Sequence, residues 1–349
     1  MKQRSFFFDN AKFILIFFVV FGHLLRSFIN DSEVILAIYK TIYAFHMPAF
    51  VLISGFFAKG IFNKAYIIQL AKKLILPYFI FQGAYSLYYY YLDAEPAIIL
   101  DPFEPHWSLW FLVSLFFWNI MIVIFVKQKK VIGMAIAISV GLLVGYLDEI
   151  SNFLSLSRTF VFFPMFLLGY YLDLSQLNKL FSFKVRIGAL FIFTIVFIGF
   201  YLYPDFNHEW LLGSKPYSEL ISLPLTAMFT RLGYYILSFI VIISFLSLVP
   251  RGQYFFTVLG RRTLYVYLLH GFFIQFFRQY HLADYFTDME NYLLLVGIAL
   301  LLTFTLSSQF VCSLAQPFIE LGTSRFSMLL IRLKALIAFF FIKKNDPIN

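Results

Sequence analysis

The 349-residue sequence has little of what a soluble or disulfide-bonded protein needs. Its single cysteine, Cys312, excludes an intrachain disulfide. Charged residues make up only 13% of the chain, against roughly 25% in a typical soluble domain. The sequence contains no Cys/His cluster, no glycine-rich phosphate loop and no His-Glu-x-x-His motif, so we expect no bound metal. Hydrophobic residues, in contrast, make up 61%, which predicts a polytopic membrane protein.

The net charge of +9 does not indicate a nucleic-acid partner. Nucleic-acid-binding proteins gather lysine and arginine on one face or along one helix. In this chain the basic residues lie in the short segments between apolar runs. Membrane topology therefore accounts for them, and we expect the lipid bilayer to be the partner.

Ten apolar runs are long enough to cross a bilayer. The run at 158–173 is short and contains Pro164, which makes it the weakest of the set. We predict an all-α polytopic membrane protein with about ten transmembrane helices, in a single domain of residues 1–320. The runs lie at about 11–29, 38–58, 74–92, 107–126, 131–147, 158–173, 187–203, 232–249, 264–280 and 292–312.

The basic residues also predict the orientation. If Lys2 and Arg4 are cytoplasmic, 20 of the 27 lysines and arginines fall on the cytoplasmic side of ten crossings. Four fall on the opposite side, and Lys12, Arg26 and Arg278 lie within the runs. The positive-inside rule then places both termini in the cytoplasm. Residues 321–349 form a basic, amphipathic tail, for which an interfacial helix on the cytoplasmic face is expected.

The first apolar run carries two polar groups on one face. Lys12 and His23 are eleven positions apart, which leaves them about 20° apart around a helix and about 16 Å apart along it. Titratable side chains in an otherwise lipid-compatible helix need a protein-lined or wet interior, which indicates a functional site. The alternative is that Lys12 snorkels to the headgroups and His23 only bonds a neighbouring helix.

The second run contains FHMPAFVLISGFF at residues 45–57. Pro48 removes one helical hydrogen bond, and Ser54 and Gly55 permit close approach or further distortion. We therefore expect this helix to be bent or broken around a cavity. His46, at its outer end, is expected at a depth similar to that of His23.

These residues resemble a known family. Asp9-Asn-Ala-Lys12, His23 and the segment at 45–57 closely resemble the opening of the integral-membrane acyltransferase-3 family, in its fucose 4-O-acetylase-like branch. The family has Arg or Lys where this chain has Lys12. The resemblance covers nearly the whole chain, but only the first sixty residues are specific. It implies a ten-helix enzyme that moves an acyl group, usually acetyl from cytoplasmic acetyl-CoA, onto a hydroxyl of a cell-surface glycan.

His23 is the candidate general base, because a neutral imidazole can take the proton of an attacking hydroxyl near neutral pH. A covalent acyl-histidine is a second route that the sequence leaves open. Lys12 is expected to hold the donor or to form an ion pair with Asp9, three residues earlier. His46 is interpreted as a substrate-binding residue or as one that orients His23; a purely structural role is the alternative.

On the donor side, the resemblance assigns Ser54, Gly55 and Phe56 to the acyl donor or oxyanion, with small-residue helix packing as the alternative. Lys72 and Lys73, in AKKLILPY, are candidates for the phosphates of coenzyme A. The positive-inside rule explains them equally well. The family's usual arginines are lysines in this chain, and a lysine lacks the planar fork that binds phosphate in bidentate fashion.

The remaining candidates lie further out or further along the chain. Trp107 and Trp110 resemble the family's Leu-Trp-Phe-Leu segment and are candidates for stacking on a sugar; an interfacial aromatic belt is the alternative. His270 is expected at a different depth from His23 and is interpreted as a packing or donor-side residue, and Arg26 is a further candidate. The long outer stretch at 204–231 is expected to be a lid or glycan-contacting loop, or an ordinary interfacial loop.

We therefore predict a membrane O-acyltransferase, an O-acetyltransferase of a cell-envelope or exported polysaccharide, in the cytoplasmic membrane of a bacterial-type cell. Acetyl-CoA is the expected donor, and no cofactor is expected to be tightly bound. Two alternatives remain. Polar groups at several depths of one helix face also describe the transport path of a glycan or lipid-glycan exporter, and a non-catalytic partner of a polysaccharide synthase is the third possibility.

Overall fold

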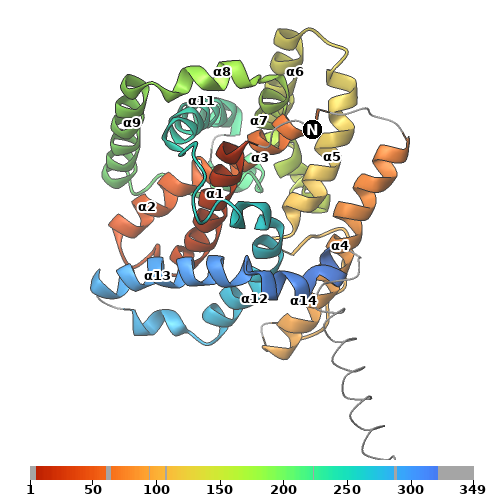
Figure 1. Cartoon of the computed structure of the whole chain (residues 1–349), viewed down its shortest axis with the longest axis vertical. Helices are drawn as coiled ribbons and strands as arrows, with labels where there is room; N and C mark the ends of the chain where they lie inside the picture. The colour runs from red at the N-terminus through yellow and green to blue at the C-terminus, as the bar shows by residue number, and fades with distance from the viewer. Residues whose placement is uncertain are drawn as a thin grey trace, which may run out of the picture.

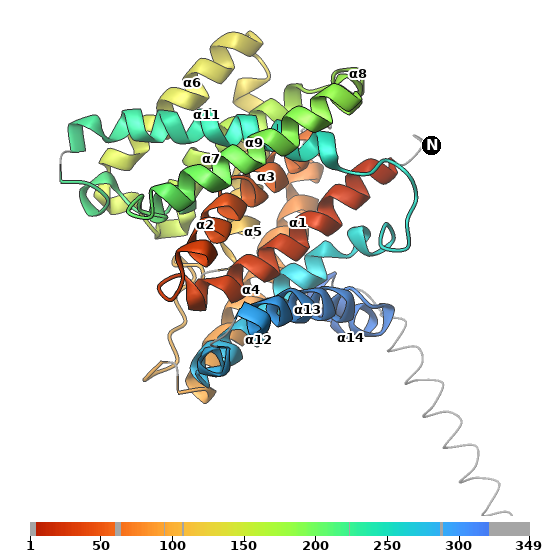
Figure 2. The ribbon, with the colours of Figure 1, turned by 90° about the vertical axis from the view of Figure 1, so that its left-hand side faces the viewer.

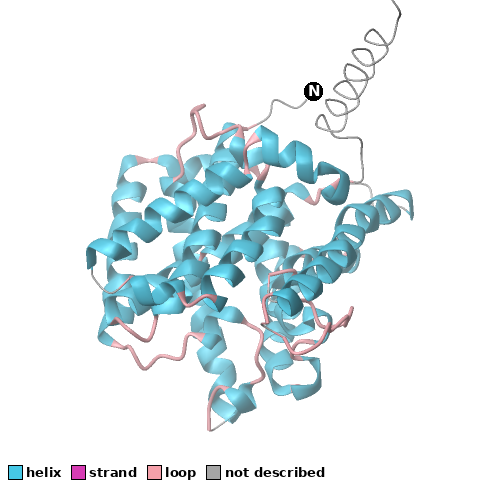
Figure 3. Ribbon diagram, turned by 90° about the horizontal axis from the view of Figure 1, so that it is seen from below, coloured by secondary structure: helices cyan, strands magenta, loops and turns pink. Residues whose placement is uncertain are grey.

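The computed structural model describes residues 5–59, 64–93, 95–106, 108–222, 224–286 and 289–320. In these ranges the chain is helical and contains no β-strand, as Figure 3 shows. The predicted all-α class is confirmed, whereas the predicted tail at 321–349 lies outside the described residues. The α-helices are α1 Phe6–Leu25, α2 Glu33–Tyr43, α3 His46–Phe57, α4 Lys64–Tyr91, α5 Trp110–Phe125, α6 Lys130–Leu143, α7 Leu156–Tyr171, α8 Leu174–Asn178, α9 Phe183–Leu202, α10 Glu209–Leu212, α11 Pro224–Leu248, α12 Thr263–Gln279, α13 Met289–Leu306 and α14 Gln309–Ile319.

Five segments of the described chain are helical, long and apolar enough to cross a membrane. Helices α13 and α14 add a sixth if the pair, which is bent by 64°, counts as one crossing. Helices α5 and α6 are apolar but shorter. The predicted ten crossings and cytoplasmic termini therefore stay predictions. The five segments are Phe6–Phe28, Glu33–Phe57, Phe153–Tyr171, Phe183–Leu202 and Leu225–Leu248.

Helix α1 lies at the centre of the molecule, in contact with α2, α3, α12 and α13 (Figures 1 and 2). In its most apolar window 61% of the residues are buried, against 17% for the peripheral α9. Apolar residues predominate on both helices, but only α1 is enclosed by protein. A polar side chain on α1 therefore faces other helices, which is the environment that a buried reactive group requires.

The start of α1 is fastened to the connection between α11 and α12. The side-chain nitrogen of Asn10 donates to the carbonyl oxygens of Pro250 and Gly252, at 2.9 and 2.8 Å. Its side-chain oxygen accepts a hydrogen bond of 2.6 Å from the Thr257 hydroxyl. Asn10 is fully buried, so these bonds satisfy an amide that would otherwise be costly to enclose. They hold α12 close to α1.

The predicted interruption of the second run is present, but upstream of the proline. Helix α2 ends at Tyr43, and α3 begins at His46. Pro48 falls in the first turn of α3, where a missing amide hydrogen costs little. The carbonyl oxygen of Ala44, which has no helical donor because residue 48 is proline, accepts a hydrogen bond of 2.9 Å from Ser238 of α11. Helix α3 then continues through Ser54 and Gly55 without a break.

Helices α3 and α7 pack with their backbones almost touching. A Cβ atom placed on Gly55 would lie 1.9 Å from the carbonyl oxygen of Phe166, and one on Gly169 would lie 1.9 Å from that of Leu52. The two glycines therefore permit a reciprocal close approach, as small residues do between membrane helices. This contact fixes α3, and with it the cavity-lining residues that α3 carries.

Candidate active site

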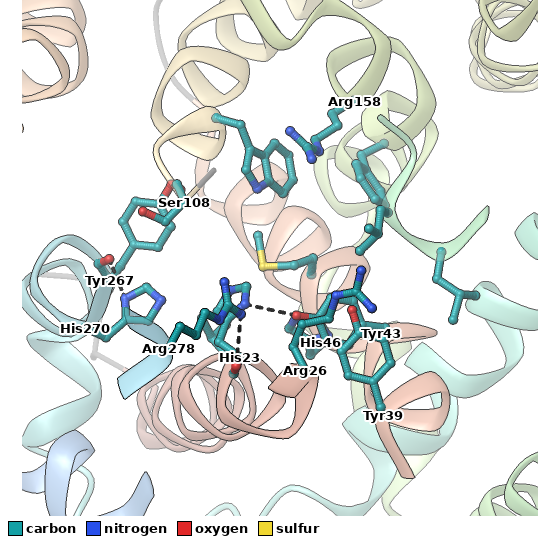
Figure 4. Close-up of a pocket in the computed structure, with 16 residues that line it drawn as sticks. His23, Arg26, Tyr39, Tyr43, His46, Ser108, Arg158, Tyr267, His270 and Arg278 are labelled. Atoms are coloured by element: carbon teal, nitrogen blue, oxygen red, sulfur yellow. Dashed lines mark hydrogen bonds between the residues drawn. The ribbon is translucent and has the colours of Figure 1, made fainter. Parts of the chain in front are cut away.

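A cavity of about 190 Å³ lies beside the C-terminal half of α1. Figure 4 shows its polar side chains converging from several helices on one space. The lining is rich in histidine, arginine and tyrosine, and its described residues include no aspartate or glutamate. They are Val19, His23, Arg26, Tyr39, Tyr43, His46, Met47, Ser108, Trp110, Arg158, Phe162, Leu211, Leu212, Tyr267, His270 and Arg278.

His23 is oriented by Tyr43. The hydroxyl of Tyr43 lies 3.1 Å from Nδ1 of His23. Gly22 makes this contact possible, because a Cβ atom at that position would lie 2.9 Å from the Tyr43 ring. The Tyr43 ring is held in turn by Tyr39, on which it stacks at 4.0 Å between centroids. In the tautomer in which Nδ1 donates to Tyr43, the Nε2 atom carries the lone pair that can take a proton.

His46 lies beside Tyr43, with the ring centroids 4.5 Å apart. Its Nδ1 is 2.8 Å from the carbonyl oxygen of Ile42, which belongs to the last turn of α2. A carbonyl only accepts, so Nδ1 of His46 carries the proton and Nε2 is the acceptor in the neutral ring. His23 and His46 therefore line the same cavity, and Tyr43 contacts both rings. Their similar depth in the membrane stays a prediction.

The expectation that His270 lies at a different depth from His23 is wrong. The two rings stack with centroids 5.4 Å apart, and Nδ1 of His270 donates to the carbonyl oxygen of Tyr267 at 2.7 Å. The prediction estimated the depth of each histidine by counting residues from the nearest loop. That estimate holds only if neighbouring helices are parallel and begin at the same depth, whereas α1 runs obliquely in Figure 2. Within the described chain, no three His, Cys, Asp or Glu side chains are grouped as metal ligands.

Three arginines surround the space in front of His23. Arg278 of α12 donates to the carbonyl oxygen of His23 at 3.1 Å, near the C-terminus of α1, where positive charge is favourable. Arg26 pairs with Glu209 at 3.6 Å. Arg158 of α7 lies across the cavity from both, and its guanidinium is 5.3 Å from the centroid of the Trp110 ring (Figure 4).

The stretch at 204–231, which the sequence predicts on the outer side, contributes to this cavity. Leu211 and Leu212, at the end of α10, line it, so the glycan-contacting interpretation of this stretch fits its position. The neighbouring His208 side chain, whose Nε2 lies 3.4 Å from a Glu209 oxygen, lowers the pKa of Glu209, and the charges of Lys215 and Arg26 lower it further. Glu209 is therefore a stable ion-pair partner for Arg26, which ties α10 to the end of α1.

A second cavity of about 390 Å³ lies along the N-terminal half of α1. Its walls are mostly apolar and come from α1, α3, α4, α5 and α12. Lys12 and Lys73 line it, as does Ser54, whose hydroxyl donates to the carbonyl oxygen of Phe50. Lys12 forms the expected ion pair with Asp9, at 3.0 Å, and the buried Asp9 also contacts Arg261 at 3.4 Å.

The two cavities adjoin. Val19, Met47 and Tyr267 line both of them, so these three side chains form the wall between the spaces. The Tyr267 hydroxyl is held by the backbone carbonyl oxygen of Ser108. Lys12 thus belongs to one cavity and His23 to the other, in agreement with the prediction that one helix face joins two polar groups at different depths.

Several predicted residues lie outside these cavities. In the described structure, Gly55 is at the α3–α7 contact, and Phe56 packs on Phe8 with centroids 4.5 Å apart. Neither lines the second cavity, a position that fits the packing interpretation. Lys72 does not line it either, in contrast to Lys73, although both lysines are exposed. Asp9 is fourteen residues before His23, about 21 Å along the helix, and cannot touch it.

The two tryptophans have different outcomes. Trp110 lines the His23 cavity, below Arg158, as a candidate substrate-contacting residue should. Trp107 lies outside the described residues, so its predicted role stays a prediction.

Other cavity residues were missed by the sequence interpretation. Tyr43, Tyr267, Arg158 and Arg278 line the His23 cavity but were not among the predicted site residues. The two arginines carry a signal that was available, because each lies in or at the edge of a predicted apolar run, where a charge indicates function. The tyrosines carry no such signal in a chain that has 23 of them.

Comparison with known proteins gives a family-level match. Residues 5–312 match the Acyl_transf_3 family model, described as an acyltransferase domain. The chain is 41% identical over 83 residues to nodulation protein NolL of Mesorhizobium japonicum, which is 22% of each chain. It is 29% identical over 157 residues to nodulation protein NolL of Sinorhizobium fredii, which is 41% of this chain and 43% of that relative. The matches thus span less than half the length of these relatives. No solved structure matches the chain.

Proposed function

Because the chain belongs to the acyltransferase-3 family, whose model matches residues 5–312, we propose that it is a membrane O-acyltransferase. In this proposal it transfers an acetyl group from cytoplasmic acetyl-CoA to a hydroxyl of a cell-envelope or exported polysaccharide, in the cytoplasmic membrane. The observation that carries the proposal is the pair of adjoining cavities on α1, one with His23 and one with two lysines.

The second cavity suits the acyl donor. Lys12 and Lys73 supply positive charge where the phosphates of coenzyme A would lie. The apolar walls suit the narrow, uncharged pantetheine portion of coenzyme A, which carries the thioester. The shared wall of Val19, Met47 and Tyr267 then separates the thioester from His23, and a rotation of the flexible Met47 side chain would join the two spaces.

The first cavity suits the acceptor. In the proposed reaction, Nε2 of His23 takes the proton of the acceptor hydroxyl while the oxygen forms a bond to the thioester carbonyl carbon. The carbon–sulfur bond then breaks, and the leaving thiolate of coenzyme A takes that proton from His23. Tyr43 keeps the ring in the required tautomer by accepting from Nδ1, at a distance of 3.1 Å.

Acyl-histidine formation is the competing route. In it, Nε2 of His23 attacks the thioester, coenzyme A leaves first, and the acceptor hydroxyl then attacks the acyl-imidazole. Purified protein incubated with labelled acetyl-CoA in the absence of acceptor separates the two routes. Label on the protein, lost when acceptor is added, supports the covalent route, whereas direct base catalysis leaves the protein unlabelled.

The activity itself is tested with labelled acetyl-CoA and polysaccharide acceptors in detergent. Acceptor labelling that is coupled to thioester loss supports the acyltransferase. An exporter would instead move glycan across the membrane of vesicles without consuming the thioester. A non-catalytic partner of a synthase would do neither, so either of these last two results contradicts the proposal.

A further inference from the structure

The unusual feature of the His23 cavity is its charge. Three arginines, Arg26, Arg158 and Arg278, line it, and none of its described lining residues is aspartate or glutamate. Guanidinium groups stay protonated in proteins, so the cavity is cationic at every physiological pH. Removing such charges from water is costly unless a negative group accompanies them. The carboxylate of Glu209 pairs with Arg26 from outside this lining and acts on Arg158 only at longer range, so one carboxylate faces three guanidinium groups.

Arg158 is the arginine whose contacts fit a ligand best. In the described structure no carboxylate lies within 4.0 Å of it and no protein group accepts a hydrogen bond from it. Its neighbour is the Trp110 ring, at 5.3 Å. The ring contact occupies none of the N–H donors in a conventional hydrogen bond, so the planar fork of the guanidinium is available to a carboxylate or phosphate.

A neighbouring outer cavity of about 450 Å³ also includes Arg158 and carries the carboxylates of Glu95, Asp101 and Glu104. None of these three carboxylates lies within 4.0 Å of the Arg158 guanidinium. Arg158 therefore stands at the boundary between an acidic outer space and the cationic space that contains His23. An anionic group bound at this boundary is drawn toward the arginines and away from the carboxylates.

We propose that the acyl acceptor carries an anionic group, a carboxylate or a phosphate, which binds Arg158 while a hydroxyl of the same sugar unit lies at His23. This rests on the proposed acyltransferase function. The cavity has room for it: about 190 Å³, whereas about 150 Å³ suffices to hold a bare six-membered ring. One acidic sugar unit, or one phosphorylated sugar unit, is the expected occupant.

The kinetic test uses matched acceptors. A uronic-acid-containing oligosaccharide is compared with the same oligosaccharide after chemical reduction of its carboxyl groups, and a sugar-phosphate oligosaccharide is the third acceptor. We expect the parent protein to favour one of the two anionic acceptors. Arg158→Gln should then raise the KM for that acceptor roughly 10- to 100-fold, the effect of losing a charged hydrogen bond, with little change for the neutral acceptor. Lys215→Gln, which removes a cation of the outer loop away from the cavity, is the matched control.

The outcomes separate the alternatives. A preference for the carboxylate or for the phosphate acceptor identifies which anion is bound. An equal fall in kcat on charged and neutral acceptors would assign Arg158 to the oxyanion of the reaction or to folding and would overturn the proposal. So would a parent protein that prefers the carboxyl-reduced acceptor.

A binding measurement tests the anion site without relying on enzymatic activity. The thermal unfolding temperature of the full chain in detergent is measured with glucuronate, with glucose 1-phosphate and with glucose. One or both anions should raise it in the parent protein and in Lys215→Gln but not in Arg158→Gln, and glucose should have no comparable effect. Failure of every acceptor in the kinetic assay, together with this pattern, would refute the proposed function and keep the anion site. No stabilisation by either anion would overturn the site.

Discussion

At the residue scale, His23 and Lys12 have separate tasks on one helix face. His23 lies in the cationic cavity with Tyr43 on its Nδ1 side, whereas Lys12 lies in the apolar cavity and pairs with Asp9. The two are about 16 Å apart along α1, so neither can act on the other directly. Each is therefore open to an independent test.

Replacing His23 with alanine should abolish acceptor acetylation, with a loss of about 10²- to 10⁴-fold in rate, because the hydroxyl proton then has no acceptor. Expression and the elution profile in detergent should be unchanged, since the imidazole lines a cavity and is not a packed apolar group. Acetyl transfer from labelled acetyl-CoA measures the effect. His281→Asn, which changes a histidine in the outer loop at a positive-φ position that asparagine tolerates, is the control. A folded His23→Ala protein with near-parental activity would leave His46 or His270 as the base.

Tyr43→Phe tests the orientation of His23. The ring keeps its stacking on Tyr39, so the variant removes only the hydroxyl, with its contact to Nδ1 of His23 and its hydrogen bond with Tyr39. We expect kcat to fall about 2- to 10-fold, with the KM for the donor unchanged. Tyr88→Phe, which removes a hydroxyl that donates to Phe272 instead, should leave kcat as it is. A change confined to KM would indicate that Tyr43 binds substrate and does not position the base.

At the element scale, the site depends on how α3 is held. Its start carries His46 and its middle carries Ser54, so both cavities use it. The hydrogen bond from Ser238 stabilises the interruption before it, and the α3–α7 glycine contact fixes its middle. A helix held at two points places its side chains reproducibly.

Gly55→Ala should lower the thermal unfolding temperature markedly, because the new methyl group would meet the Phe166 backbone at 1.9 Å, and backbone cannot rotate away. Gly83→Ala, in α4, is the matched control, since nothing lies within 4 Å of a Cβ atom there. That variant should be neutral, or stabilised by up to about 1 kcal/mol through helix propensity. Equal thermal stability of the two variants would show that the close approach is absent.

At the scale of the whole molecule, the proposed function requires a donor side and an acceptor side on opposite faces of a membrane. The cavity with Lys12 and Lys73 and the cavity with His23 lie at successive positions along α1. This order matches a cytoplasmic donor and an outer acceptor if the amino terminus is cytoplasmic. Two measurements address this arrangement.

Lys73→Gln should raise the KM for acetyl-CoA several-fold and leave the KM for the acceptor alone, because Lys73 lines the donor-side cavity. The difference should shrink at high salt if the attraction is electrostatic. Lys72→Gln removes the adjacent charge, which is also exposed but lies outside that cavity, and should have a smaller effect. Equal effects would mean that both lysines only set membrane topology.

A tag at either terminus should be cytoplasmic, because the basic segments alternate through ten predicted crossings. Impermeant labelling reagents should therefore reach the tag only after the cells are opened. Labelling of one tag in intact cells would place that terminus outside the cell and would imply an odd number of crossings.

The sequence by itself determined the all-α class, the membrane-like composition and the importance of the first sixty residues. Apolar runs of spanning length are a local property, and Lys12 and His23 lie on one helix, so their spacing follows from helix geometry alone. The ion pair between Asp9 and Lys12 is also local, and it is present in the structure. His23 and His46 could be paired because they lie on consecutive predicted spans, the second of which the structure divides into α2 and α3.

Only the tertiary structure decided which helix is central and which distant side chains meet. Apolar residues predominate on both α1 and α9, yet one helix is enclosed and the other is peripheral, because helix packing depends on shape rather than on hydrophobicity. The oblique course of α1 brings His270 onto His23, 247 positions away in the sequence. Packing of α7 and α12 around it likewise brings Arg158 and Arg278 into the cavity. No local pattern encodes these contacts, since each depends on the tilt and position of helices that are far apart in the chain.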